Sequence, residues 1–118
     1  MAREYPETVV IDFDGTLCKF AFPDVGPPEP NVREALTRLK ELGYKICIHS
    51  VRTATYWGKD REHHIQAIKK FMEENELPYD EILTNRNMDK PIAAMYIDDR
   101  AIRYEGDWLK IIKIIGNM

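Results

Sequence analysis

Two carboxylates, Asp12 and Asp14, stand two positions apart where a run of branched apolar residues ends. Side chains at positions i and i+2 of an extended segment point the same way, so both carboxylates can share one pocket. Gly15 lets the backbone turn sharply after them, and Thr16 adds a hydroxyl and a further backbone N–H. Two carboxylates this close repel each other unless a cation lies between them or one holds a proton. The pattern therefore indicates either a site for a hard metal ion or a nucleophile beside an acid.

More polar groups stand at the ends of other apolar runs. Ser50 follows one run, Asp98 and Asp99 follow another, and Lys90 stands just ahead of that last run. The carboxyl ends of parallel strands meet at one edge of a sheet, where α/β proteins place their ligands, so these groups can converge. Four carboxylates in one cleft need roughly two positive charges to balance them, and a magnesium ion together with Lys90 would supply these. A hydroxyl, an ammonium group and turn amides suit a dianionic phosphoryl group.

A parallel sheet is needed to position these groups, and the apolar pattern predicts one. Strand and helix signals alternate along the chain, which is typical of an α/β fold. Strands are expected at 9–11, 44–49, 82–83 and 93–97, and helices at 31–42, 60–75 and 107–115. Asn31 is expected to cap the first helix, and the last helix is expected to pack back on the sheet. We therefore predict a single domain over residues 1–118: a three-layer, Rossmann-like α/β domain with a mostly parallel sheet.

In this order the motifs resemble those of the haloacid dehalogenase (HAD) superfamily of magnesium-dependent phosphatases. The run Asp12-Phe13-Asp14-Gly15-Thr16 is similar to the first family motif, Ser50 to the second, Lys90 to the third, and Ile97-Asp98-Asp99 to the fourth. The resemblance covers the chain from about Thr8 to Arg103. It implies hydrolysis of a phosphate monoester, with a small metabolite such as a sugar phosphate or nucleotide as the substrate.

The resemblance also implies a role for each acid. Asp12 would attack phosphorus and become an aspartyl phosphate, while Asp14 would protonate the leaving oxygen and later take a proton from the hydrolytic water. A Mg²⁺ ion would be held by Asp12, the main-chain carbonyl of Asp14 and Asp98, with Asp99 helping directly or through water.

The remaining candidates are expected to contact phosphate. The resemblance implies that Ser50 and Lys90 steady the phosphoryl oxygens, and the turn at Gly15 and Thr16 would offer its amides to them. Arg52 follows Ser50 by two positions and is a further candidate for a contact with substrate or phosphate; a surface ion pair explains it equally well.

The intervals between the motifs are filled by the expected helices and strands, so we expect no cap domain. An open site without a cap must accept a large substrate or borrow a lid from another subunit, which makes a homo-oligomer plausible. The chain carries a formal net charge of −3 and has no basic stripe, so nucleic acid is an unlikely partner. It shows neither an apolar run long enough to span a bilayer nor a signal peptide, and its two cysteines, Cys18 and Cys47, fit no metal-ligand spacing. These features favour a cytoplasmic protein with no membrane contact.

Two other functions remain alternatives to a phosphatase. A signalling receiver domain also uses strand-end acids, magnesium and a Lys-Pro pair, but there the acid pair comes first and the Lys-Pro last. Here the acid pair Asp98-Asp99 follows Lys90-Pro91, which argues against that alternative. A catalytically weak binding module would be expected to lack the nucleophile or the acid, and neither is missing.

Overall fold

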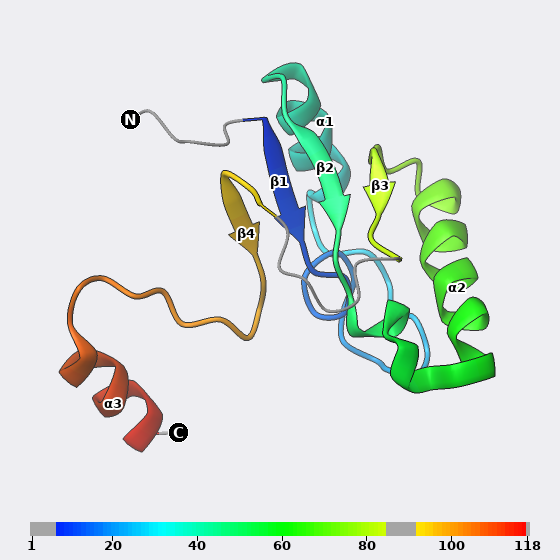
Figure 1. The fold of residues 1–118 in the computed structure, drawn as a ribbon. Coiled ribbons are helices and arrows are strands. Elements are labelled where there is room, and N and C mark those ends of the chain that lie inside the picture. Colours follow the sequence, from blue (N-terminus) through cyan, green and yellow to red (C-terminus); the bar gives the residue numbers. More distant parts are fainter. Residues whose placement is uncertain (1–6, 85–91, 118) are drawn as a thin grey trace.

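Four strands form one parallel sheet in the computed structural model, which describes residues 7–84 and 92–117 (Figure 1). The order across the sheet is β3-β2-β1-β4, with bounds β1 Thr8–Ile11, β2 Lys45–Ile48, β3 Glu81–Ile82 and β4 Met95–Ile97. Ile11 lies opposite Ile48 on one side and Ile97 on the other. Three strands therefore end in register, and the residues that follow them are brought together.

Two helices cover one face of this sheet. They are α1, Val32–Glu41, and α2, Arg61–Glu74, which is preceded by the 3-10 turns η1, Val51–Thr53, and η2, Thr55–Asp60. Alternate residues of β1 point to opposite faces. Ile11 shares a buried cluster with Leu36 of α1 and Met72 of α2, whereas Val10 packs on the other face with Cys47 and Leu83. Both helices thus lie on the face to which Ile11 points.

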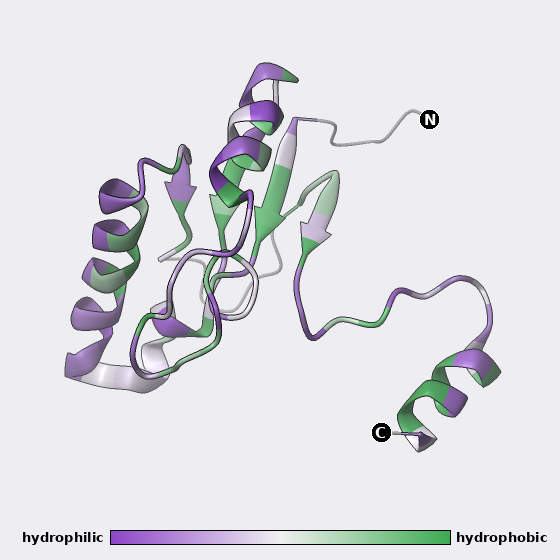
Figure 2. Cartoon of the chain, turned by 180° about the vertical axis from the view of Figure 1, so that it is seen from behind, coloured by the Kyte–Doolittle hydropathy of each residue, from purple (hydrophilic) through white to green (hydrophobic). Residues whose placement is uncertain are grey.

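The last helix, α3 (Trp108–Gly116), does not pack on the sheet. It stands apart from the other elements at the end of the segment that follows β4, and Figure 2 shows its hydrophobic stretches on that separate arm. Trp108 is 66% exposed and Leu109 is 81% exposed. The prediction that this helix packs back on the sheet is therefore wrong. Among the described residues, no helix forms the third layer that the sequence led us to expect.

The α/β class and the parallel sheet are confirmed, and the described segments contain no inserted cap domain. The first helix lies where it was predicted, but its start differs in mechanism. Asn31 has a left-handed backbone (φ 64°) and its side chain makes no capping hydrogen bond. In the described ranges, none of the helices is both long and apolar enough to cross a membrane.

Candidate active site at the carboxyl edge of the sheet

Three acids meet where two neighbouring strands end. Asp12 follows β1, while Asp98 and Asp99 follow β4, and one carboxylate oxygen from each lies within 4.8 Å of the others. The register explains this meeting, because the Asp12 N–H donates to the Ile97 carbonyl at 2.9 Å and so extends the pairing to the first polar residues. Carboxylate oxygens at this spacing could share one hard cation such as Mg²⁺.

The electrostatics of Asp12 reflect this crowding. Burial raises the pKa of its carboxyl from 3.8 to about 7, against an opposing hydrogen bond from the Phe13 backbone, with further upward contributions from Asp98 and Asp99. The side chain is only half-buried, so the neighbouring acids matter as well as the loss of solvent. A cation placed among the three carboxylates would remove the cause of their mutual repulsion and favour the ionised form of Asp12.

The backbone conformation of the turn requires glycine at position 15, and the side chain of Asp99 also approaches it closely. The φ of Gly15 is +83°, and a Cβ atom at this position would overlap Asp99 Oδ2. Its N–H donates to the Cys18 carbonyl at 2.9 Å, and the Thr16 N–H donates to the Phe13 carbonyl at 3.2 Å. The two amides that the sequence suggested for phosphate therefore stabilise the turn itself. The Thr16 hydroxyl is buried and finds no hydrogen-bond partner within the described ranges.

The carboxylate of Asp14 does not belong to the three-acid group and is held by Arg52 instead. Two parallel hydrogen bonds join them: Arg52 Nε donates to Asp14 Oδ2 and Arg52 Nη2 donates to Asp14 Oδ1, each at 2.8 Å. The guanidinium also donates to the carbonyls of Pro23, at 3.2 Å, and Asp24, at 2.8 Å. The side chains of Arg52 and Asp14 are 1% and 7% exposed. Arg52 thus does not form a surface ion pair. Four of its five N–H groups bond to Asp14 and the loop, and it is not among the residues that line the cavity beside Asp12.

Ser50 and Asp12 share a small cavity. Its volume is about 290 Å³, and Asp98 lines it as well. Ser50 Oγ accepts a hydrogen bond from the Arg52 N–H at 3.1 Å, so the serine also shapes the turn that leaves β2. The structure therefore brings three of the predicted site residues to one cavity. Lys90, the predicted partner of these acids, lies outside the described residues.

Two solved structures are similar to this chain over nearly its whole length. A conserved protein from Bacteroides thetaiotaomicron has a TM-score of 0.66 and 22% identity, over 95% of this chain and 91% of that one. A crystal structure from Vibrio cholerae has a TM-score of 0.57 and 27% identity, over 94% of this chain and 98% of that one. No family model and no curated protein matches the sequence. The likeness shows that other chains of similar length share this fold.

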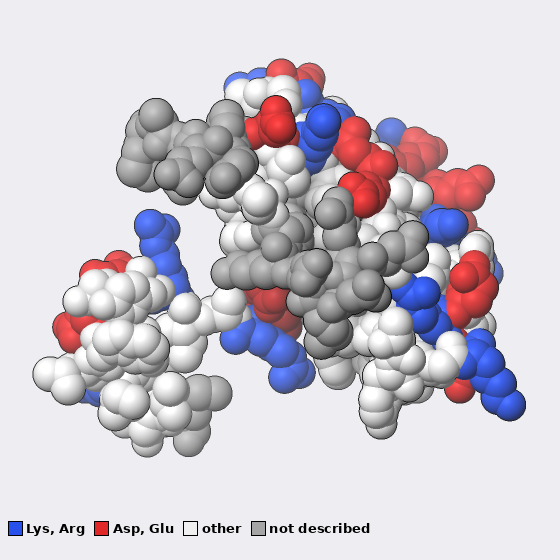
Figure 3. Space-filling model, in the orientation of Figure 1, with Lys and Arg blue, Asp and Glu red and all other residues white. Residues whose placement is uncertain are grey.

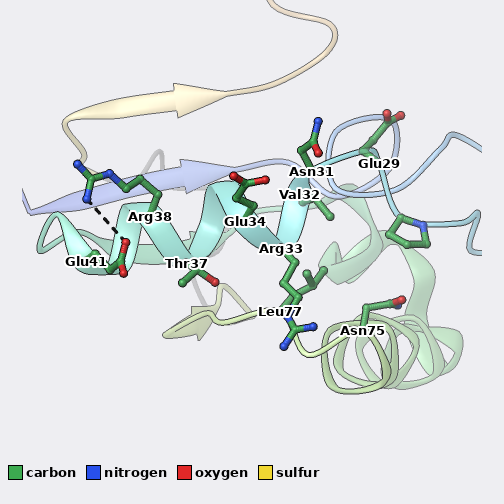
Figure 4. A pocket seen from close by; sticks show the side chains of 11 residues that line it. Glu29, Asn31, Val32, Arg33, Glu34, Thr37, Arg38, Glu41, Asn75 and Leu77 are labelled. Carbon is green, nitrogen blue, oxygen red and sulfur yellow. Dashed lines mark ion pairs between the residues drawn. The ribbon is translucent and has the colours of Figure 1, made fainter.

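A wider depression of about 770 Å³ lies along α1, away from the acids (Figure 4). Its wall combines α1 with Asn75 and Leu77, and two of its charged residues, Arg38 and Glu41, pair with each other at 3.7 Å. None of the strand-end carboxylates lines it. We therefore place the candidate site in the smaller cavity.

Sequence reasoning missed two residues of that cavity, Thr53 and Arg61. Both follow Ser50 along the chain, but only the turns η1 and η2 bring the start of α2 back to the end of β2. Arg61 Nε donates to the Thr53 carbonyl at 2.6 Å, which fixes this return. A lone arginine at the first position of a helix carries no signal of such a contact, so the pattern could not have identified it.

Proposed function

We propose that this protein is a magnesium-dependent phosphatase, similar to the HAD superfamily, that hydrolyses a phosphate monoester through an aspartyl phosphate at Asp12. The observation that carries the proposal is the meeting of Asp12 with Asp98 and Asp99 beside Ser50. A nucleophilic carboxylate, two further acids for a metal ion and a hydroxyl for phosphoryl oxygens are what this reaction requires.

The three acids fit a magnesium ion on chemical grounds. All donors are carboxylate oxygens, which Mg²⁺ prefers, and the pKa of Asp12 is raised by burial and also by its two acidic neighbours, Asp98 and Asp99, whose repulsion a cation would relieve. Asp12, Asp98 and Asp99 would hold the ion, with the Asp14 carbonyl as the fourth protein ligand. Bound Mg²⁺ would neutralise charge on the transferring phosphoryl group.

This chain's own residues would then divide the work. Asp12 attacks phosphorus as the bond between phosphorus and the leaving oxygen breaks, and the leaving oxygen takes a proton from Asp14. Water then attacks the aspartyl phosphate and gives a proton to Asp14, which releases phosphate and restores Asp12. Ser50 donates its hydroxyl to a phosphoryl oxygen, and Lys90 is proposed to offset the charge on Asp12. Asp14 is proposed as the acid and base. Since Arg52 holds its carboxylate, Asp14 must separate from Arg52 before it can reach the leaving oxygen.

The same ion pair favours a second candidate function. If Asp14 stays bound to Arg52, no acid or base serves the second step, and the aspartyl phosphate would persist. The protein would then act as a phosphoacceptor or a weak binding module rather than as an efficient phosphatase.

We further propose that two copies associate through α3. The exposed side chains of Tyr104, Trp108, Leu109 and Ile112 belong to one mostly uncharged arm (Figure 3). Large exposed aromatic and aliphatic side chains of this kind contribute most of the apolar area in stable protein interfaces. A second copy would cover the apolar side chains of α3 that do not contact the sheet of their own chain.

Light scattering after size exclusion tests this association. We expect the wild type to be larger than one chain and Leu109→Lys to shift it to a monomer. Tyr56→Lys, at a residue that is 85% exposed but distant in sequence from this arm, is the matched control. A monomeric wild type at micromolar concentration would rule the association out.

The phosphatase proposal is tested by phosphate release from p-nitrophenyl phosphate, sugar phosphates and nucleotides, with MgCl₂ or with EDTA. We expect Asp12→Asn to lower turnover by about 1,000-fold or more, since it removes the nucleophile. Asp60→Asn, which changes an exposed acid without a capping hydrogen bond, should keep wild-type turnover.

The outcomes separate the two candidates. Turnover that survives EDTA or Asp12→Asn contradicts the proposed chemistry. Release of a single phosphate per chain, with an acyl phosphate that hydroxylamine discharges, would favour the phosphoacceptor. The substrate is expected to be a small cytoplasmic metabolite, since both cysteines are free and buried and the cavity is small.

A further inference from the structure

The cavity beside Asp12 contains an arginine that the proposed chemistry does not use. Arg61 lines it together with Ser50, Thr53 and Asp98. It is the first residue of α2, and its Nε donates to the Thr53 carbonyl at 2.6 Å. This bond fixes the base of the guanidinium in the wall that also carries the proposed reaction centre.

The outer nitrogens of Arg61 are left for a ligand. Within the described ranges, neither Nη1 nor Nη2 makes a hydrogen bond, and no acid pairs with this side chain. Arg52, by contrast, spends its donors on Asp14 and the loop carbonyls. A guanidinium keeps its charge at all physiological pH values, and two neighbouring amino groups match the two oxygens of a carboxylate.

The charge balance of the cavity makes a substrate anion the natural partner. Its acids, Asp12 and Asp98, belong to the group proposed to hold the metal ion. Among the described lining residues, Arg61 is the one lysine or arginine. With the phosphoryl group held at Asp12 and Ser50, the guanidinium of Arg61 is available to a second anionic group on the same molecule.

The volume limits how large that molecule can be. At about 290 Å³ the cavity lies at the lower end of ordinary ligand pockets. This volume equals that of about ten water molecules, which suits a phosphoryl group joined to a short carbon chain.

We propose that Arg61 forms a subsite for a carboxylate and that the substrate is a phosphorylated hydroxy acid or sugar acid. This inference rests on the proposed phosphatase function. In this arrangement Arg61 binds the carboxylate and so determines which substrates are accepted, while Asp12 attacks the phosphoryl group.

A pair of substrates that differ in one group tests the subsite. 3-Phosphoglycerate carries a carboxylate where glycerol 3-phosphate carries a hydroxymethyl group. We expect the wild type to prefer 3-phosphoglycerate in kcat/KM by about tenfold or more, since only this ester can accept charged hydrogen bonds from Arg61 at that position. Arg61→Gln should abolish most of this preference, with losses in both kcat and KM, and Arg61→Lys should restore part of it because it keeps the charge.

Lys69→Gln is the matched control, since it removes one positive charge from an exposed position of the same helix that does not line the cavity. It should keep the wild-type preference. Urea unfolding midpoints of all variants show whether each is folded. A wild type without the preference, or an Arg61→Gln variant that retains it, overturns the subsite.

A direct binding measurement tests the Arg61 subsite separately from the proposed phosphatase function. Calorimetric titration of Asp12→Asn with each of the two esters needs no turnover. We expect 3-phosphoglycerate to bind at least about tenfold more tightly, and the added Arg61→Gln change to remove the difference. Equal affinities overturn the subsite. Failure of the wild type to release phosphate from any ester of the panel, 3-phosphoglycerate included, defeats the phosphatase proposal instead and leaves the binding result to decide on Arg61.

Discussion

The buried pair between Arg52 and Asp14 should make Arg52→Met one of the most destabilising changes in this chain. Methionine keeps the length and apolar volume of the stem but removes every donor. The Asp14 carboxylate, 7% exposed, would then be buried without its counter-ion. Breaking a buried ion pair on one side costs about 3–5 kcal/mol, a large share of the 5–15 kcal/mol that stabilises an ordinary domain.

The size of the loss follows from the contacts. Two hydrogen bonds to Asp14 and two to the loop carbonyls of Pro23 and Asp24 disappear together. The guanidinium also lies 4.9 Å from the ring centroid of Phe22, and this cation–π contact is lost as well. The double variant Arg52→Met with Asp14→Asn removes the unpaired charge, so we expect it to recover about 1–3 kcal/mol despite carrying two changes.

Urea unfolding followed by circular dichroism measures these free energies. Arg33→Met is the control, because its ion pair with Glu76 at 2.7 Å joins side chains that are 64% and 69% exposed. Such a pair contributes about 0–1 kcal/mol. A loss in Arg52→Met no larger than that of the control would refute the reasoning, and so would a double variant less stable than Arg52→Met.

Three further outcomes follow from the site and its surroundings. Without metal, the pKa of Asp12 is about 7 in the folded protein and 3.8 in the unfolded chain. Between these values the folded state binds the proton more tightly, so the free energy of unfolding should fall as the pH rises from 4 to 7. Asp12→Asn should remove about 1–2 kcal/mol of this pH dependence, a figure reduced because the Asp12 side chain is half exposed. Urea unfolding midpoints that change with pH as in the wild type would contradict this. Gly15→Ala should weaken Mg²⁺ binding in calorimetry by displacing Asp99, whereas Gly43→Ala, with φ +91° and open space around it, should lose stability alone. Equal Mg²⁺ affinities in the two variants would disprove that role. Burial raises the pKa of the Cys18 thiol, so Ellman's reagent at pH 8 should label it only after unfolding, and rapid labelling of the folded protein would oppose this.

The sequence predicted the sheet well because apolar runs and their polar ends are local signals. Asp12, Ser50 and Asp98 each follow such a run, and a parallel sheet in register brings them together. The apolar periodicity of α3 was equally clear and predicted the helix, but it could not say what the helix packs against. An apolar helix face indicates that another surface must cover it, and that surface can belong to the same chain or to another.

The pairing of Arg52 with Asp14 lay beyond pattern reading for a different reason. Both residues stand beside the predicted motifs, and a surface position or a substrate contact fitted Arg52 equally well. Only the loop that returns through Pro23 and Asp24 buries the guanidinium and completes its hydrogen bonds. Contacts of this kind depend on the path of an irregular segment, for which no periodicity exists.

The ion pair between Asp14 and Arg52 must break before Asp14 can transfer protons. The carboxylate proposed to move protons is also the one that anchors the loop at 23–24, through Arg52. Any state in which Asp14 turns toward a leaving group must break two charged hydrogen bonds and leave Arg52 with the loop carbonyls alone. Binding of a substrate anion must supply that free energy, since an empty site has nothing to replace the contact. A substrate that binds at two points, the phosphoryl group and the Arg61 subsite, is better able to do so than a minimal ester. Small esters that bind at one point are therefore expected to lose kcat as well as affinity, which is the kinetic mark of binding energy used to release Asp14.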